Sequence, residues 1–184
     1  MQNAFEKFGT SHRNDVASQP PASWDKNSSN ATLNPAEFMS HKSLLLLDDD
    51  DDDCDLFQEA LHEVDRTAAL KTTNSCHQLM TLLRQPDADL PDLIVMDLNM
   101  PKQNGFECLA GLKVTRELKH IPVVIFSTSA QREAIDQAYS RGAMHYITKP
   151  YAFRALKQIV TRLLTLDLRK LNDPQSREKF LLEF

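Results

Sequence analysis

The fold of this chain is decided by a stretch of ten residues, LLLLDDDDDD (Leu44–Asp53). Four leucines in a row are typical of a strand that is buried on both faces, as in a parallel sheet. A second apolar run, Leu93–Met96, also ends in an aspartate, Asp97. Two buried strands that end in carboxylates would bring several negative charges to one edge of one sheet. Because these charges repel each other, the sequence predicts a site that holds a cation or a proton, and oxygen ligands favour a hard divalent ion such as Mg²⁺.

The pattern around these two runs predicts the fold class. A third apolar run, Val123–Phe126, and two more mixed runs, Ala69–Thr73 and His145–Thr148, complete a set of strands separated by amphipathic segments. This order predicts an α/β protein with a flavodoxin-like, doubly wound, five-stranded parallel sheet of strand order 2-1-3-4-5. The mixed runs are expected at the two edges of the sheet. In this topology the ligand crevice lies at the carboxyl ends of the first and third strands, where the aspartates are.

Composition narrows the class of protein further. The 184 residues carry a net charge of −5, which argues against a nucleic-acid or anionic-membrane partner. No segment is long and apolar enough to span a bilayer and no secretory signal is present, so a cytoplasmic protein is expected. The three cysteines, Cys54, Cys76 and Cys108, have no metal-ligand spacing, and we expect them to be reduced thiols.

The chain is predicted to have one folded domain, residues 42–168, between two tails. Residues 1–41 are rich in Ser, Asn and Pro and are expected to be a disordered upstream segment rather than a functional part. Residues 169–184 form a C-terminal tail that ends in the apolar sequence KFLLEF. That ending could pack on its own domain, join a partner's surface, or fray.

The acidic run is expected to have two functions. A solvated acidic loop is the usual reading of such a run, but this run directly follows a strand and precedes an amphipathic helix. Asp48 and Asp49 are therefore predicted to face the pocket, and Asp50–Asp53 to cap and charge the N-terminus of the helix. Two further strand ends carry polar groups, the hydroxyl of Ser127 and the ammonium of Lys149.

Taken together, the strand-end acids, Asp97, Ser127 and the Lys149-Pro150 pair resemble the receiver domain of bacterial response regulators, over Lys42 to about Leu166. The resemblance implies that Asp97 is the phosphoacceptor, that Ser127 and Lys149 contact the phosphoryl group, and that Tyr146 is the aromatic residue that reorients on activation. It also implies a Mg²⁺ site, formed by Asp48, Asp49, Asp97 and the backbone carbonyl of Asn99.

The resemblance further implies a role in two-component signalling, with a phosphohistidine of a histidine kinase or histidine phosphotransfer protein as donor. Such a domain phosphorylates itself and loses the phosphoryl group slowly, so it is not an enzyme in the usual sense. It signals to a downstream protein by changing conformation, and it can form a homodimer through the fourth helix, fifth strand and fifth helix. Fewer than twenty residues follow Leu166, which leaves no room for a DNA-binding output domain.

The alternative is a Mg²⁺-dependent phosphatase of the haloacid dehalogenase type. That family also uses a strand-end aspartate, but it requires Asp-x-Asp followed by Thr or Val. Here Asp48-x-Asp50 is followed by Asp51 and Asp52, and the chain has no room for a cap insertion. The sequence therefore favours the receiver.

Overall fold

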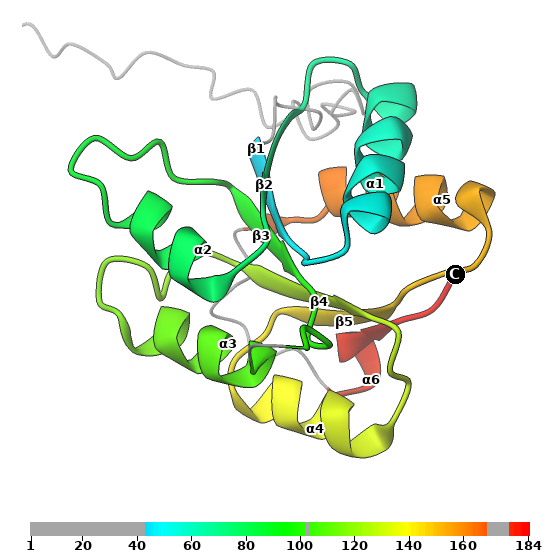
Figure 1. Cartoon of the computed structure of the whole chain (residues 1–184). Helices are drawn as coiled ribbons and strands as arrows, with labels where there is room; N and C mark the ends of the chain where they lie inside the picture. The colour runs from blue at the N-terminus through cyan, green and yellow to red at the C-terminus, as the bar shows by residue number, and fades with distance from the viewer. Residues whose placement is uncertain (1–42, 102–103, 169–176) are drawn as a thin grey trace, which may run out of the picture. The chain divides into compact units, whose positions relative to one another are not determined.

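The computed structural model describes residues 43–101, 104–168 and 177–184. Within these ranges strands and helices alternate as the sequence pattern predicts (Figure 1). The predicted strands are all present: β1 (Ser43–Leu47), β2 (Ala69–Thr73), β3 (Leu93–Met96), β4 (Val123–Ser127) and β5 (His145–Thr148). The helices that follow them are α1 (Asp51–Val64), α2 (Cys76–Leu83), α3 (Gly105–Val114), α4 (Arg132–Ser140) and α5 (Phe153–Leu164). The predicted N-terminal tail, residues 1–41, lies outside the described residues, as do residues 169–176.

The sheet confirms the predicted strand order and extends it. Its order is β2-β1-β3-β4-β5-β6, and neighbouring strands are parallel throughout. The additional strand, β6 (Leu181–Leu182), follows a short helix, α6 (Arg177–Phe180), and pairs with β5. The described end of the chain therefore packs on its own domain. The predicted order of the first five strands is confirmed, but the prediction that the sheet has only five strands was wrong. His145–Thr148 is consequently not an edge strand, because the apolar C-terminal residues cover its open side.

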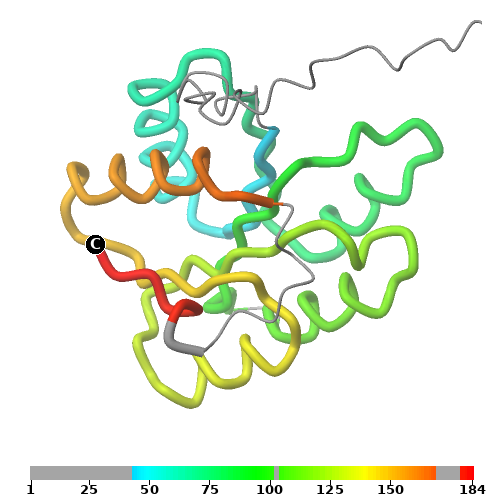
Figure 2. Tube along the Cα trace, turned by 180° about the vertical axis from the view of Figure 1, so that it is seen from behind, coloured from blue at the N-terminus to red at the C-terminus, as the bar shows by residue number. Residues whose placement is uncertain are grey.

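Helices cover both faces of the sheet. Alternate residues of a strand point to opposite faces, so Leu44 and Leu46 pack with Phe57 in one apolar cluster, and Leu45 and Leu47 join the other. Helices α1 and α5 lie over the first face and α2, α3 and α4 over the second, as the front and rear views show (Figures 1 and 2). In the described ranges, no helix combines the length and the apolar character that crossing a bilayer requires.

Local sequence explains where helix α1 begins and where helix α4 ends. The side chain of Asp50 accepts hydrogen bonds from the backbone N–H groups of Asp52 and Asp53, so the acidic run caps α1 as predicted. The acids in its first turn also favour the positive end of the helix dipole. Helix α4 is followed by Gly142, whose φ of 83° is the left-handed conformation that ends many helices.

The structure corrects the prediction for two of the three cysteines. Cys76 at the start of α2 and Cys108 in α3 form a disulfide, with Cα atoms 5.7 Å apart. The sequence did not predict this pairing, because the two cysteines are 32 residues apart and meet only where α2 and α3 pack on the same face of the sheet. Cys54 remains a free thiol. Burial, with the nearby charges of Asp48 and Asp51, raises the pKa of Cys54 to about 11, which disfavours the reactive thiolate.

Candidate functional site

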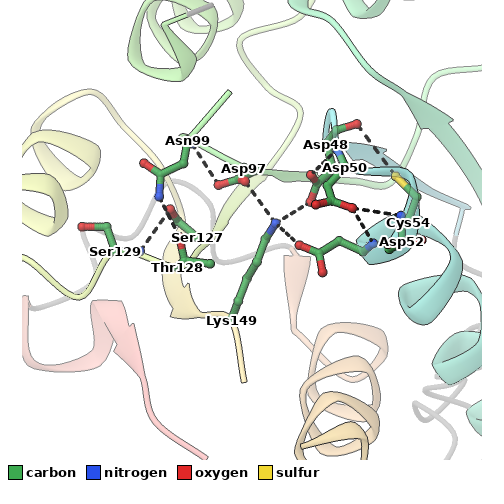
Figure 3. Close-up of polar contacts among 11 residues, drawn as sticks. Asp48, Asp50, Asp52, Cys54, Asp97, Asn99, Ser127, Thr128, Ser129 and Lys149 are labelled. Carbon is green, nitrogen blue, oxygen red and sulfur yellow. Dashed lines mark hydrogen bonds and ion pairs between the residues drawn. The ribbon is translucent and has the colours of Figure 1, made fainter. Parts of the chain in front are cut away.

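The ammonium group of Lys149 is the centre of the candidate site. Its Nζ donates hydrogen bonds to three carboxylates: Asp48 Oδ2 at 2.7 Å, Asp53 Oδ2 at 2.7 Å and Asp97 Oδ2 at 3.0 Å. These groups come from the carboxyl ends of β1, β3 and β5 and from the first turn of α1 (Figure 3). The parallel sheet thus gathers residues that are about 50 to 100 positions apart in the sequence, as the topology predicted.

Burial makes the charges of this cluster interdependent. The side chain of Lys149 is only 8% exposed, and Asp48 and Asp97 are also buried. Burial alone would lower the pKa of Lys149, but its bonds to Asp48 and Asp53 and the charges of Asp48 and Asp97 outweigh this effect and raise the pKa. For Asp48 burial has the opposite direction: it raises the pKa of the carboxyl group, and the hydrogen bond and charge of Lys149 oppose this effect. Three carboxylates face one ammonium, so the site has excess negative charge and favours a further cation.

Asp97 lies at the junction of two loops that connect strands to helices. Its Oδ1 accepts a hydrogen bond from the backbone N–H of Asn99 at 3.0 Å. The side-chain amide of Asn99 in turn donates to Thr128 Oγ1 at 2.8 Å, which joins the loop after β3 to the loop after β4. The loop after β3 also packs tightly against the start of α3. A Cβ atom at Gly105 would lie 2.7 Å from Leu98 Cα, so only glycine fits there.

Ser127 and Tyr146 lie next to each other behind the loop after β4. Both side chains are fully buried, and their strands are neighbours in the sheet. The Tyr146 hydroxyl donates to the backbone carbonyl of Ser129 at 2.7 Å, and the N–H of Ser129 donates to Ser127 Oγ at 3.5 Å. Burial raises the pKa of Tyr146, although hydrogen bonding to Ser127 and Ser129 opposes this. The phenol is therefore neutral and available as a donor.

Sequence reasoning divided the acidic run only partly as the structure does. Asp48 faces the site and Asp50 caps α1, as predicted. Asp53 was assigned to the helix end alone, yet it bonds Lys149. Asp49 was also expected to face the pocket; its side chain is exposed and makes no bond to Lys149, so its role as a metal ligand stays a prediction. Asp53 lies in the first turn of a helix that starts at the site, and this position could have indicated its contact with Lys149.

The donor set suits a hard divalent cation with few protein ligands. Asp48 and Asp97 both lie within 3.0 Å of Lys149 Nζ, so their carboxylates are near neighbours, and all their donor atoms are oxygen. In the part of the chain that the structure describes, no group of three or more His, Cys, Asp or Glu side chains has the geometry of a complete metal cage. Mg²⁺ commonly binds through one or two carboxylates and several waters, so this arrangement fits it.

The fold and the site together define a class of protein. A doubly wound sheet with buried acids at the ends of two adjacent strands, and a lysine at the end of a third, is the arrangement expected of a signalling phosphoacceptor domain. A comparison with models of protein families matches residues 44–161 to the response regulator receiver domain. The chain therefore belongs to the receiver domain family of response regulators.

Individual relatives agree with this assignment. The chain is 33% identical to the response regulator Rcp1 of Synechocystis over 132 residues, 65% of this chain and 84% of Rcp1. It is 36% identical to the chemotaxis protein CheY-3 of Vibrio cholerae over 72 residues, 39% of this chain and 55% of CheY-3. The chain spans about half the length of two curated relatives, CheY-3 at 55% and the probable methanogenesis regulatory protein FilR2 of Methanothrix harundinacea at 48%.

Solved structures show the same similarity. The phosphorylated cyanobacterial phytochrome response regulator RcpA is 38% identical, with a TM-score of 0.62 over 67% of this chain and 91% of RcpA. The Mn²⁺-bound form of Rcp1 is 32% identical, with a TM-score of 0.61 over 69% of this chain and 94% of that one. These similarities support the receiver rather than the phosphatase alternative.

Proposed function

We propose that this receiver accepts a phosphoryl group on Asp97 and acts as a phosphorylation-dependent switch in two-component signalling. The observation that carries the proposal is the bonding of Lys149 to carboxylates at the ends of two other strands. Asp48 and Asp97 are the described aspartates that both end a central strand and bond Lys149, and of these two Asp97 has its loop bonded to the loop that follows Ser127, through Asn99 and Thr128. Asp97 is 4% exposed, so its carboxylate is held in position by the surrounding structure.

The chemistry of transfer follows from the groups at the site. A carboxylate is a weak nucleophile, so the donor must be an activated phosphoryl group such as the phosphohistidine of a histidine kinase or phosphotransfer protein. An oxygen of Asp97 attacks phosphorus, the bond from phosphorus to the donor nitrogen breaks, and Lys149 neutralises charge on the transferred group. When bound, Mg²⁺ would offset the remaining negative charge, and we assign its ligands as Asp48, Asp49, Asp97 and the backbone carbonyl of Asn99.

The switch couples Asp97 to Ser127 and Tyr146. A phosphoryl group on Asp97 brings oxygens that need donors, and the buried hydroxyl of Ser127 is suited to supply one. Its movement would disturb the loop that Tyr146 bonds through Ser129. Moving a two-state equilibrium from 1:99 to 99:1 takes roughly 5.5 kcal/mol, and a hydrogen bond to a charged group contributes about 1.5–3 kcal/mol. Ser127 must therefore share the effect with Lys149 and backbone donors.

The partners and setting of this switch are part of the proposal. We propose a cytoplasmic protein that is phosphorylated by a histidine kinase or histidine phosphotransfer protein, that loses the phosphoryl group slowly by its own catalysis, and that binds a downstream protein. The face formed by α4, β5 and α5 is the candidate surface for that partner or for a homodimer.

Phosphorylation by acetyl phosphate tests the proposal. Wild-type protein incubated with acetyl phosphate and Mg²⁺ should gain one phosphoryl group by intact mass, and Asp97→Asn should gain none. Asp89→Asn, which removes an exposed aspartate between α2 and β3, is the matched control and should be labelled like wild type. Undiminished labelling of Asp97→Asn would overturn the assignment.

A second assay separates the receiver from the phosphatase alternative. A receiver should barely hydrolyse a chromogenic phosphate ester, because it is expected to take the phosphoryl group from activated donors and to lose it slowly, so turnover does not build up. Sustained turnover that Asp97→Asn abolishes would favour the phosphatase.

A further inference from the structure

The C-terminal segment, residues 179–184, occupies a surface that the receiver fold would otherwise leave open. Strand β6 pairs in parallel with β5, with Leu181 opposite Tyr146 and Leu182 opposite Ile147. The segment lies along β5 beside α4 in both views (Figures 1 and 2). An uncovered edge strand presents unpaired N–H and C=O groups, which readily pair with another chain. The segment therefore covers the edge of the same face that we propose as the partner surface.

Phe180 is the most buried side chain of residues 179–184. Phe180 is 1% exposed, and its ring centroid lies 5.2 Å from that of Tyr139 on α4 and 6.5 Å from that of Tyr146 on β5. A second contact joins His145 Nδ1 to the carbonyl of Lys179 at 3.1 Å. The residues after Phe180 are less buried, and Phe184 is 51% exposed. A segment held by so few buried groups can leave the domain without unfolding it.

A chain of contacts connects Phe180 to the proposed phosphoacceptor. Tyr146, which packs against Phe180, donates its hydroxyl proton to the carbonyl of Ser129, and Ser129 N–H donates to Ser127 Oγ. The same loop is joined to the loop after Asp97 through the bond between Asn99 and Thr128 (Figure 3). Recruitment of the Ser127 hydroxyl to a phosphoryl oxygen would therefore change the support of the Tyr146 ring, and with it the packing of Phe180.

The end of the segment also borders the site itself. A cavity of about 440 Å³ has Leu181–Phe184 on one side and Ala130, Lys149 and Pro150 among its other lining residues. The backbone that carries Lys149 and the loop after Ser127 thus share a cavity with the C-terminal segment. This gives the site a second route to the segment, independent of Tyr146.

We propose that residues 179–184 are a built-in cover of the β5 edge, docked while Asp97 bonds Lys149 and released when Asp97 is phosphorylated. This inference rests on the proposed function. Release exposes the backbone edge of β5 together with Tyr139 and Tyr146, an apolar and aromatic strip. Such a strip fits an extended apolar segment of a protein partner, which would add to the sheet as a strand.

Thermodynamic linkage gives the proposal a reciprocal consequence. If a phosphoryl group weakens docking of the segment by some factor, then loss of docking must strengthen binding of a phosphoryl mimic by the same factor. Phe180→Ala should therefore bind beryllofluoride, which mimics the phosphoryl group, more tightly than wild type by about fivefold or more. Phe184→Ala makes the same change at an exposed position of the segment, and it should change the affinity for beryllofluoride less than Phe180→Ala does.

The direct test is amide hydrogen exchange by NMR on the full chain, with Mg²⁺ and with or without beryllofluoride. Exchange at Leu181 and Leu182 should be faster by about fivefold or more when beryllofluoride is bound. Tyr146→Phe keeps the ring that Phe180 contacts but removes the bond to Ser129. It should uncouple the segment from the loop after β4, so that beryllofluoride still binds but has a reduced effect on exchange at Leu181 and Leu182. This variant keeps the proposal testable if Phe180→Ala fails to fold.

Fluorine NMR of bound beryllofluoride separates the possible failures. If beryllofluoride binds wild type but not Asp97→Asn, and exchange at Leu181 and Leu182 is unchanged or slower, the cover is not coupled to the site and only this inference is wrong. If beryllofluoride does not bind wild type, the proposed function and this inference both fail. Equal affinities of Phe180→Ala and wild type would also overturn the coupling.

Discussion

The carboxyl edge of the sheet and the β5 edge are built in opposite ways. The carboxyl edge gathers charged side chains from three strand ends and one helix, and Lys149 joins them through ion pairs. The β5 edge is covered by a short apolar segment with one fully buried ring, Phe180. Strand order brings the three strand ends of the first arrangement together, whereas the second needs a contact between distant segments that no strand order implies. The first should therefore be hard to disturb without loss of stability, and the second easy to displace.

The largest effect is expected from Lys149→Met, which removes the only cation that bonds Asp48, Asp53 and Asp97 among the described residues. Breaking a buried pair leaves uncompensated buried charge, which costs about 3–5 kcal/mol of unfolding free energy. Urea denaturation at pH 7 measures this, and Mg²⁺ should recover part of the loss. The matched control is Lys157→Met, which breaks the exposed pair with Glu63 and should cost about 0–1 kcal/mol. Equal losses in the two variants would mean that the site cluster is not held by its charges.

A smaller loss is expected from Phe180→Ala. Burial of a phenylalanine side chain contributes about 1.5–3 kcal/mol, and the loss cannot exceed the free energy with which the segment docks. The control is Phe184→Ala, whose exposed ring should contribute within about 0.5 kcal/mol. Both values come from urea denaturation at pH 7. A loss from Phe180→Ala as large as that from Lys149→Met would contradict the view that the cover is displaceable.

The sequence predicted the carboxyl edge well because topology and residue type both specify it. Asp48 and Asp97 directly follow apolar runs and Lys149 follows a more mixed one, and parallel strands bring such ends together. Asp53 was assigned only to the helix end because a helix position does not reveal which way a side chain reaches. The pairing of Cys76 with Cys108 and the docking of Phe180 were not predicted, because both depend on how helices and a distant segment pack. Periodicity identifies an apolar face but not its partner.

A third prediction concerns the division of the acidic run in metal binding. Asp49→Ala should weaken Mg²⁺ binding by about tenfold or more, because each assigned carboxylate is one of few protein ligands. Asp52→Ala should have little effect, since Asp52 lies in the first turn of α1 and its N–H is bonded to the Asp50 side chain. Isothermal titration with Mg²⁺ measures both. Similar losses in the two variants would show that general acidity, rather than Asp49, binds the metal.

The smallest effect is expected from the pH dependence at His145, which joins β5 to the C-terminal segment. Burial lowers the pKa of His145 below its usual value of 6.5, although bonds to the backbone of Phe180 and Lys179 oppose this, and the charge of Arg162 adds to it. As pH falls below 6.5, the unfolded chain takes up a proton that the folded chain does not, so stability falls. Thermal unfolding between pH 7.5 and 5.5 should show a smaller loss for His145→Gln than for wild type. Identical losses would indicate that His145 does not titrate on unfolding.

The central claim is that Asp97, and no residue of the acidic run, accepts the phosphoryl group. Borohydride reduces an aspartyl phosphate to homoserine, so treatment of the acetyl-phosphate-labelled protein followed by peptide mass spectrometry identifies the acceptor directly. The account predicts homoserine at position 97 in labelled protein and none at positions 48–53. Homoserine at any of Asp48–Asp53, with Asp97 unchanged, would contradict it.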